Sequence, residues 1–309
     1  MREYRIGEII RKRRIELGLT QGELCEGIYE EPTMSRIENG KQTPSRTKLS
    51  VLLQRLGLPD DRYYALLSDN ETKIADLQKE IVSCNVLKDS IRGLEKISEL
   101  EKIAEDDDTA IHQFILRSKI LLGKIEDGEV REYSFEEKLE KLFQAIYLTS
   151  PKFNIEEIEK GLFGLDEVKV INQIAGVYSD MGQNKKVIDI YYQLLKYIKK
   201  HFKNIFQSGG LLPLVSYNYA RELNLVGRYK DAVEIAEIGW KSCVQYGQYR
   251  HLPAIIALIA ECYHFLDQDQ KSIEYYRQAY YIHKAIGNEK SVQVVISEVK
   301  KYFGNNFKL

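Results

Sequence analysis

Histidine and cysteine are the residue types that most often serve as general bases, nucleophiles or metal ligands. The chain of 309 residues contains five histidines and four cysteines: His112, His201, His251, His264, His283, Cys25, Cys84, Cys243 and Cys262. The histidines form no HExxH or paired-ligand spacing, and the cysteines form no CxxC pair. The sequence also lacks phosphate-loop, GxSxG and dinucleotide-binding motifs. We therefore expect no catalytic residue, no metal site, no cofactor and no enzymatic activity.

Composition and charge favour a cytoplasmic protein with no membrane partner. Scattered cysteines fit a reducing compartment, and the start MREYRIGEIIRKRR is too charged for a signal peptide. The longest apolar run, Leu252 to Ala260, is far shorter than a membrane span. Residues 1–58 carry 11 basic and 8 acidic side chains, a net of +3, whereas the remainder carries 34 and 38, a net of −4. This asymmetry indicates that only the start of the chain meets phosphate.

The stretch from Leu19 to Gly40 predicts two short helices joined by a turn. Thr20 can cap the first helix, and Glu23 completes a capping box with it. Pro32 suits the first turn of the second helix, and Gly40 can end that helix in the left-handed conformation. Such short helices need neighbours to bury a core, and apolar residues at helical spacing supply them: Ile6, Ile9, Ile10, Leu17, Leu49, Leu52, Leu53 and Leu56. A fifth helix over 60–67 is expected to complete this helical head.

Three runs in the head resemble the XRE (Cro/C1-type) helix-turn-helix family: L-T-Q-x-E-L at Leu19–Leu24, S-R-I-E-N-G-K at Ser35–Lys41, and P-S at Pro44–Ser45. The resemblance implies a five-helix domain that binds double-stranded DNA, with the second helix of the motif in the major groove. It also implies a set of contacts to phosphate, base edges and the far DNA backbone, made by Thr20, Gln21, Glu31, Pro32, Thr33, Arg36, Asn39 and Lys41.

The sequence departs from the family pattern where the second helix begins. Pro32 stands where the family commonly has a small polar residue, and Glu30 and Glu31 place acids beside it. Either these acids favour the positive end of the helix dipole, which we prefer, or Glu31 accepts a hydrogen bond from a cytosine. Arg36 either pairs with these acids or contacts DNA, and we expect the DNA contact.

The densest basic run is Arg11-Lys12-Arg13-Arg14. Alone it would indicate a solvated helix face. Beside a helix-turn-helix motif, it indicates contact with the DNA backbone.

Ser68-Asp69-Asn70 is the predicted hinge, because three turn-forming residues separate two helical patterns. The predicted domains are therefore a helix-turn-helix domain over 1–69 and a helical body over 70–309. Apolar residues at three- and four-residue steps predict a linker helix within 70–104. Coiled-coil pairing of this helix with a second chain is the weaker alternative, because Gly93 and drifting heptads oppose it. The acids at 105–108 are expected to form a loop that caps the next helix.

Three segments of the body share one pattern of offsets and lie 45 and 40 residues apart. In each, a small residue lets the first helix approach its neighbour, and a turn residue precedes the second helix. The aligned positions are Ala175, Tyr178, Gly182, Val187, Tyr191; Ala220, Leu223, Gly227, Ala232, Ala236; and Ala260, Tyr263, Asp267, Ser272, Tyr276. The pattern resembles the tetratricopeptide repeat (TPR), whose helix pairs stack into an α-solenoid. The expected fold class is therefore all-α, with weaker helix pairs at 76–104 and 109–148.

An XRE head on a TPR-like body resembles the PlcR/Rgg/ComR group of peptide-pheromone quorum-sensing regulators. The resemblance implies a cytoplasmic, homodimeric transcription factor. It further implies two ligands: a palindromic operator, and a short signalling peptide bound in the concave groove of the solenoid.

Residues on the groove side of each first helix are the candidate peptide contacts. They lie away from the packed faces centred on Ala175, Ala220 and Ala260, so their polarity is not expected to serve packing. Asparagine can pair with a peptide backbone, Arg221 can hold a carboxylate, and Glu261 can take an amino terminus or a basic side chain. The alternative is a hydrated inner wall without a ligand. The candidates are Asn172, Tyr217, Asn218, Arg221, Asn224, Glu261 and His264.

Two other functions fit parts of the sequence. The solenoid could bind a protein partner instead of a peptide, as in phage-repressor-like or antitoxin-like regulators. A modulator similar to the Rap phosphatases would use such a solenoid too, but that group carries a different amino-terminal bundle.

Overall fold

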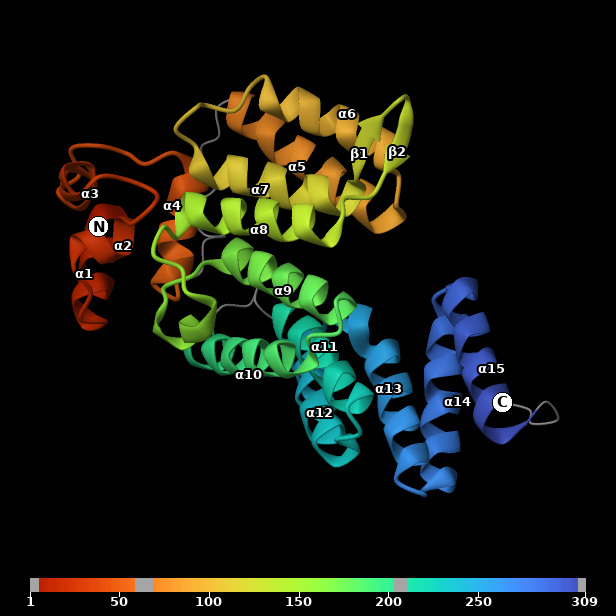
Figure 1. The fold of residues 1–309 in the computed structure, drawn as a ribbon. Coiled ribbons are helices and arrows are strands. Elements are labelled where there is room, and N and C mark those ends of the chain that lie inside the picture. The colour runs from red at the N-terminus through yellow and green to blue at the C-terminus, as the bar shows by residue number, and fades with distance from the viewer. Residues whose placement is uncertain (1–5, 59–68, 203–209, 305–309) are drawn as a thin grey trace. The chain divides into compact units, whose positions relative to one another are not determined.

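The structure, a computed structural model, describes residues 6–58, 69–202 and 210–304. The chain forms two compact units, one comprising Met1–Met181 with His201–Ile205 and the other Gly182–Lys200 with Phe206–Leu309. Helices dominate both units, as Figure 1 shows. The predicted all-α class is confirmed, with one short β-hairpin in the described ranges that was not predicted from the sequence.

The head comprises four described helices, namely α1 (Ile6–Glu16), α2 (Gln21–Cys25), α3 (Glu31–Glu38) and α4 (Arg46–Arg55). Their apolar faces share one core that includes the fully buried Ile10, Leu24, Met34, Leu52 and Leu53. The predicted fifth helix over 60–67 lies outside the described residues.

Both helix ends predicted for the turn motif are confirmed. The Thr20 hydroxyl accepts a hydrogen bond from the Glu23 amide at 3.1 Å, and the Glu23 carboxylate accepts one from the Thr20 amide at 2.7 Å. Gly40 ends α3 with a φ of 68°. A close contact between α1 and α3, which also depends on a glycine, was not predicted. A Cβ on Gly7 would lie 2.0 Å from the Ile37 carbonyl oxygen, so α1 and α3 approach closely only because residue 7 has no side chain.

The rest of the first unit is also mainly helical. The region predicted as a linker is a helix pair, α5 (Asp69–Leu87) and α6 (Ser90–Glu101), which packs against α7 (Thr109–Leu122). Asp108 caps α7 by accepting from the Ile111 amide at 3.2 Å, as predicted for the acidic loop. The remaining helices of this unit are α8 (Phe135–Thr149), the 3₁₀ helix Ile155–Lys160, and α9 (Leu165–Asp180).

The hairpin lies between α7 and α8. Its strands β1 (Lys124–Glu126) and β2 (Glu129–Arg131) pair antiparallel, with Ile125 opposite Val130. Asp127 and Gly128 both adopt positive φ, which is the two-residue turn that Asp-Gly favours. The hairpin is hard to predict from the sequence because strands of three residues show almost no alternation of apolar and polar side chains.

The second unit contains α10 (Asn184–His201) except its last residue, followed by α11 (Leu211–Leu225), α12 (Tyr229–Tyr246), the 3₁₀ helix Tyr249–His251, α13 (Leu252–Phe265), α14 (Asp269–Ala285) and α15 (Glu289–Phe303). From α11 onward each helix packs against the next, as expected for stacked helix pairs. The three aligned turn positions, Gly182, Gly227 and Asp267, all adopt positive φ. The predicted repeat register is therefore confirmed, and α15 extends the series beyond the last repeat identified in the sequence.

Candidate functional site

The predicted DNA-contacting residues of α3 lie on its solvent side. Glu31, Pro32 and Arg36 are exposed, Thr33 is half-buried, and Met34 and Ile37 point into the core of the head. Among the described residues Arg36 has no ion-pair partner, so the alternative pairing with the neighbouring acids is absent. Asn39 and Lys41, just beyond the helix, are exposed too.

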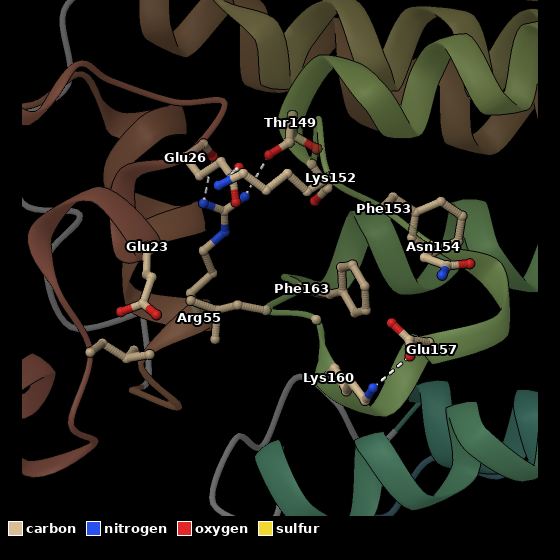
Figure 2. A pocket seen from close by; sticks show the side chains of 14 residues that line it. Glu23, Glu26, Arg55, Thr149, Lys152, Phe153, Asn154, Glu157, Lys160 and Phe163 are labelled. Carbon is tan, nitrogen blue, oxygen red and sulfur yellow. Dashed lines mark hydrogen bonds and ion pairs between the residues drawn. The ribbon is translucent and has the colours of Figure 1, made fainter.

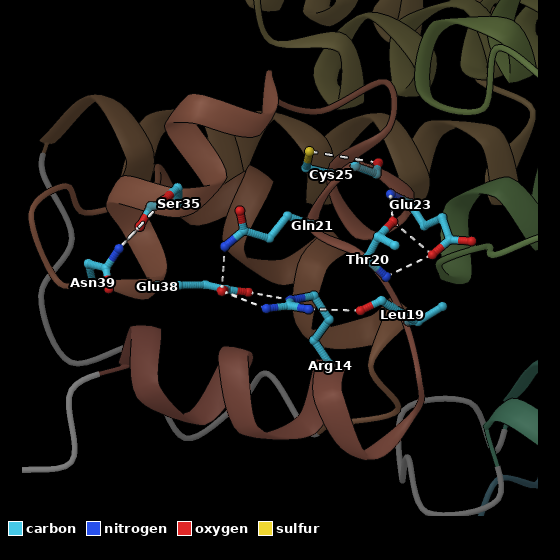
Figure 3. Close-up of polar contacts among 10 residues, drawn as sticks. Arg14, Leu19, Thr20, Gln21, Glu23, Cys25, Ser35, Glu38 and Asn39 are labelled. Atoms are coloured by element: carbon cyan, nitrogen blue, oxygen red, sulfur yellow. Dashed lines mark hydrogen bonds and ion pairs between the residues drawn. The ribbon is translucent and has the colours of Figure 1, made fainter.

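Gln21 has a structural partner that the sequence did not predict. Its side-chain amide donates to the Glu38 carboxylate at 2.7 Å, and the Arg14 guanidinium donates to the same carboxylate at 2.6 and 2.8 Å (Figure 3). Glu38 is almost fully buried. Burial raises the pKa of Glu38, but the bonds from Arg14 and Gln21 outweigh burial and hold this pKa below its ordinary value. The three residues tie α1, the start of α2 and the end of α3 into one rigid arrangement.

The basic run of α1 is divided between two roles. Arg14 pairs with Glu38, and Arg13 donates to the Leu56 carbonyl at 3.1 Å, so both serve the interior of the head. Arg11 and Lys12 are exposed and line a hollow of about 450 Å³ together with Asn39. The run therefore places two basic side chains, rather than four, next to the end of α3.

Arg55 of α4 anchors the head within the first unit. Its guanidinium donates to the carbonyl oxygens of Leu24, Glu26 and Thr149 at 2.9, 2.8 and 2.7 Å, and lies 3.3 Å from the Glu167 carboxylate. The Arg55 and Glu167 side chains are each 2 % exposed. A second pair, Lys48 and Asp107 at 2.7 Å, joins α4 to the loop before α7. The helix-turn-helix helices therefore pack into the same unit as α7 to α9. The domain boundary at 69/70 remains a prediction from the sequence.

A cavity of about 310 Å³ lies beside Arg55 (Figure 2). Acidic, basic and aromatic side chains line it, including Glu23, Lys152, Phe153 and Phe163. Lys152 pairs with Glu26 at 2.9 Å, and Lys160 pairs with Glu157. The polar groups of this cavity thus largely neutralise one another, and we assign no ligand to it.

The second unit brings several predicted groove residues into one cluster. The Asn224 amide of α11 donates to one oxygen of Glu261 on α13 at 2.8 Å. The hydroxyl of Tyr302 on α15 donates to the other oxygen of Glu261 at 2.6 Å. His264 lies against Tyr302, with ring centroids 4.5 Å apart, and its Nδ1 is 2.8 Å from Asp269. We call Asn224, Glu261, Tyr302, Glu298 and Tyr276 the groove cluster.

The prediction that the polar side chain of Asn224 does not serve packing is wrong. Asn224 is 9 % exposed, and its amide oxygen accepts from the buried Cys262 thiol at 3.5 Å. Its amide therefore links α11 to α13, because it satisfies two groups of that helix.

The other predicted groove residues are more dispersed. Tyr217 and Arg221 are half-buried on α11, and burial raises the pKa of Tyr217. Arg221 lies 3.2 Å from Glu222. Asn218 is half-buried on the same helix, and Asn172 lies on α9, in the first unit. Five of the seven candidates predicted from the sequence therefore lie in or beside the cluster, namely Tyr217, Arg221, Asn224, Glu261 and His264.

Glu298, Tyr302 and Tyr276 were missed as site residues. Burial and the charge of Glu261 raise the pKa of Glu298 to about 7, partly offset by Tyr276 and Lys301. Tyr276 is fully buried, and its hydroxyl faces Glu298. The apolar spacing of Val292, Val295 and Val299 was the available signal that one more helix follows the recognised repeats.

The described residues show neither a metal site nor a membrane span. No group of three or more His, Cys, Asp or Glu side chains in the described ranges is arranged to hold a metal ion. No helix in those ranges combines the length and apolar character needed to cross a membrane.

Fold and site together define a helix-turn-helix protein with a TPR-like helical body. The model of the "Helix-turn-helix domain" family matches residues 5–65, and that of the "RNPP family C-terminal domain" matches residues 80–304. The second match spans most of the chain, and the chain therefore belongs to the RNPP family.

Solved structures share this fold at low sequence identity. PlcR of Bacillus thuringiensis, crystallised in complex with the peptide PapR7 and DNA, is 19 % identical and has a TM-score of 0.59, covering 94 % of this chain and 98 % of that one. Apo PlcR is 20 % identical, with a TM-score of 0.58 and coverage of 95 % and 98 %. The SHP pheromone receptor Rgg2(C45S) of Streptococcus dysgalactiae is 16 % identical, with a TM-score of 0.50 and coverage of 96 % and 99 %. The predicted resemblance to the PlcR/Rgg group is confirmed.

One curated relative matches a smaller part of the chain. The probable ATP-dependent transporter ycf16 of Trieres chinensis is 31 % identical over 94 residues. These residues make up 30 % of this chain and span 36 % of that protein's length. Because the match is partial, no activity is transferred from it.

Proposed function

We propose that this protein is a sequence-specific DNA-binding transcriptional regulator that is switched by a short signalling peptide. The observation that carries the proposal is the union, in one chain, of a helix-turn-helix domain and an RNPP C-terminal domain. The fold shared with PlcR, whose crystal contains both a peptide and DNA, supports the same pair of ligands here. The proposed place of action is the cytoplasm.

The DNA-binding surface is the exposed side of α3 with the neighbouring part of α1. Arg36 is the proposed reader of a base edge, because an unpaired guanidinium can bond the two acceptors of guanine. Positive charge for the DNA phosphates near Arg36 comes from the exposed Lys41, Arg11 and Lys12. Gln21 and Thr20, with Glu31, Pro32, Thr33 and Asn39, complete the proposed contact surface.

The active form in this proposal is a homodimer on a palindromic operator. A two-fold dimer would present two α3 helices to half-sites about one helical turn, roughly 34 Å, apart. One head alone contacts only one half-site, so dimer contacts from the helical body would raise the affinity.

The peptide site in this proposal is the groove side of α11, α13 and α15. Glu261, Asn224 and His264 lie there within one hydrogen-bonded and ring-stacked cluster, with Tyr217 and Arg221 on the same side of α11. A peptide switches DNA binding only if it binds the two states of the protein with different affinity. A protein partner bound in the same groove is the second candidate.

Two steps test the proposal. The full chain is first incubated with a randomised duplex library, and the enriched sequence is expected to be palindromic. It is then titrated by calorimetry with fractionated culture medium of the source organism, and the bound material is identified by mass spectrometry. Recovery of a short peptide that changes operator affinity supports the proposal. Recovery of a folded protein alone would favour the second candidate.

A further inference from the structure

The first residue of α3, Glu31, contacts α2 through its acidic side chain. A Cβ on Gly22, the second residue of α2, would lie 3.2 Å from Cδ of Glu31 and closer still to its Oε1. The carboxylate therefore occupies the space that any side chain at residue 22 would need. The contacted atoms are the far end of a flexible side chain, so a Cβ at residue 22 would displace the carboxylate and not the backbone.

The environment of Cys25 agrees with this position of Glu31. Burial, followed by the charge of Glu31, raises the pKa of the Cys25 thiol to about 11. Cys25 lies three residues after Gly22, and residues at that spacing share one side of a helix. The Glu31 carboxylate therefore lies along one side of α2.

The side of α3 that is proposed to read bases points in another direction. At roughly 100° per residue, Glu31 lies about 140° around the axis of α3 from Arg36, whereas Pro32 lies only about 40° from Arg36. Arg36 and Pro32 are both exposed. A carboxylate beside them would repel the DNA phosphates. With Glu31 on α2, its negative charge is kept away from Arg36.

We propose that Gly22 positions Glu31: because residue 22 has no side chain, the Glu31 carboxylate stays on α2 and borders the DNA-binding surface without bonding a base. This inference rests on the proposed function, because it names a residue that controls the specificity of the same surface. Gly22 is a positioning residue, since it acts through Glu31. Glu31 then favours the positive end of the α3 dipole and does not accept a hydrogen bond from a cytosine.

Alanine at residue 22 should move the carboxylate toward DNA. Its Cβ takes the space of Glu31 Oε1, and the core residue Met34 lies one turn further along α3, so the open direction is the exposed side of that helix. Operator binding should weaken there through repulsion from phosphate. Alanine is also a better helix former than glycine, so Gly22→Ala should unfold at a temperature at least as high as wild type does. Weaker DNA binding by this variant would then not be a loss of folding.

The test is a double-mutant cycle on the full chain, measured by fluorescence anisotropy with the operator selected from the randomised duplex library. Gly22→Ala should weaken binding about tenfold or more, and adding Glu31→Gln should restore it to within about threefold of wild type, because glutamine keeps the shape and removes the charge. Glu31→Gln alone should leave the base preference unchanged.

Two matched controls separate this effect from general ones. Gly176→Ala changes another glycine inside a helix, where an added Cβ meets no atom within 4 Å, and should bind the operator as wild type does. Glu30→Gln removes the neighbouring exposed acid and should not restore binding to Gly22→Ala.

Three outcomes overturn the inference while DNA binding stands. Gly22→Ala that binds as wild type does would show that residue 22 does not position Glu31. If Glu31→Gln fails to restore binding, or Glu30→Gln restores it equally well, the charge of Glu31 is not the cause of the loss. If Glu31→Gln alone relaxes the preference at one base position, Glu31 reads a base. If wild type selects no operator at all, the proposed DNA-binding function fails together with the inference.

Discussion

The guanidinium of Arg55 in α4 lies 3.3 Å from the carboxylate of Glu167 in α9, and both side chains are 2 % exposed. The pair joins the helix-turn-helix helices to a helix more than a hundred residues further along the chain. Arg55 also donates to three backbone carbonyls, which leaves little freedom for its side chain. The head is therefore anchored to α9 by an ion pair whose two side chains are almost fully buried.

Replacing Arg55 with Met should destabilise the first unit by about 3–5 kcal/mol, because the Glu167 carboxylate would remain buried without its partner. Chemical denaturation of the full chain, followed by hydrogen exchange in α2 and α9, measures this effect. Lys152→Ala removes an exposed pair with Glu26 nearby and is the control, for which little change is expected. Equal stability of Arg55→Met and wild type would show that Arg55 does not anchor the head.

Arg36→Ala should weaken operator binding by about 1–3 kcal/mol and relax the preference at one base position. Lys41→Ala should instead weaken all sequences alike and reduce the dependence on salt, since it contacts phosphate. Binding measured across a randomised operator library separates the two effects. Unchanged affinity in both variants would remove this face of α3 from the DNA interface.

The contribution of Glu38 to stability should depend on pH. Because the folded pKa of Glu38 lies below its ordinary value of 4.5, its stabilisation is complete above that pH and is lost as the pH falls through the folded pKa. Glu38→Gln should cost about 1.5–3 kcal/mol at pH 7, since it breaks charge-assisted bonds to Arg14.

The difference between wild type and Glu38→Gln should accordingly shrink below about pH 4.5. Amide exchange in α1 and α3 at several pH values checks this, because these helices share the network. A difference that is the same at pH 7 and pH 3.5 would contradict the assigned role of the ion pair.

Asn224→Ala should destabilise the second unit by about 1–3 kcal/mol, because it leaves an oxygen of Glu261 and the Cys262 thiol without their partner. The adjacent Leu225→Ala, at a side chain that is 62 % exposed, should change stability by about 0.5 kcal/mol or less. Thermal unfolding of both variants makes the comparison. If the two variants are equally stable, the link from α11 to α13 is not structural.

Local features of this protein could be predicted from sequence, and long-range partnerships could not. The cap formed by Thr20 and Glu23 and the left-handed end at Gly40 involve residues within one turn, so their spacing is visible in the sequence. The partners of Arg55 lie up to 112 positions away, and no spacing rule identifies them. The role predicted for Asn224 was wrong for the same reason, because the burial of its side chain depends on how α13 packs against α11.

The groove cluster includes residues of α15, a helix that follows the last repeat identified in the sequence. Glu261 was predicted because it lies in the last segment that aligned with its neighbours. Glu298 and Tyr302 were missed because α15 has no second helix among the described residues and so completes no repeat. The contact of Tyr302 with Glu261 follows only from the stacking of α13, α14 and α15.

The most direct test of the proposed switch is the affinity of the full chain for its selected operator, measured by fluorescence anisotropy with and without a saturating amount of the peptide recovered from culture medium. We expect the peptide to change operator affinity at least tenfold in one direction, about 1.4 kcal/mol, because it binds two states of the protein unequally. An operator affinity that is the same with and without bound peptide would contradict the proposed switch.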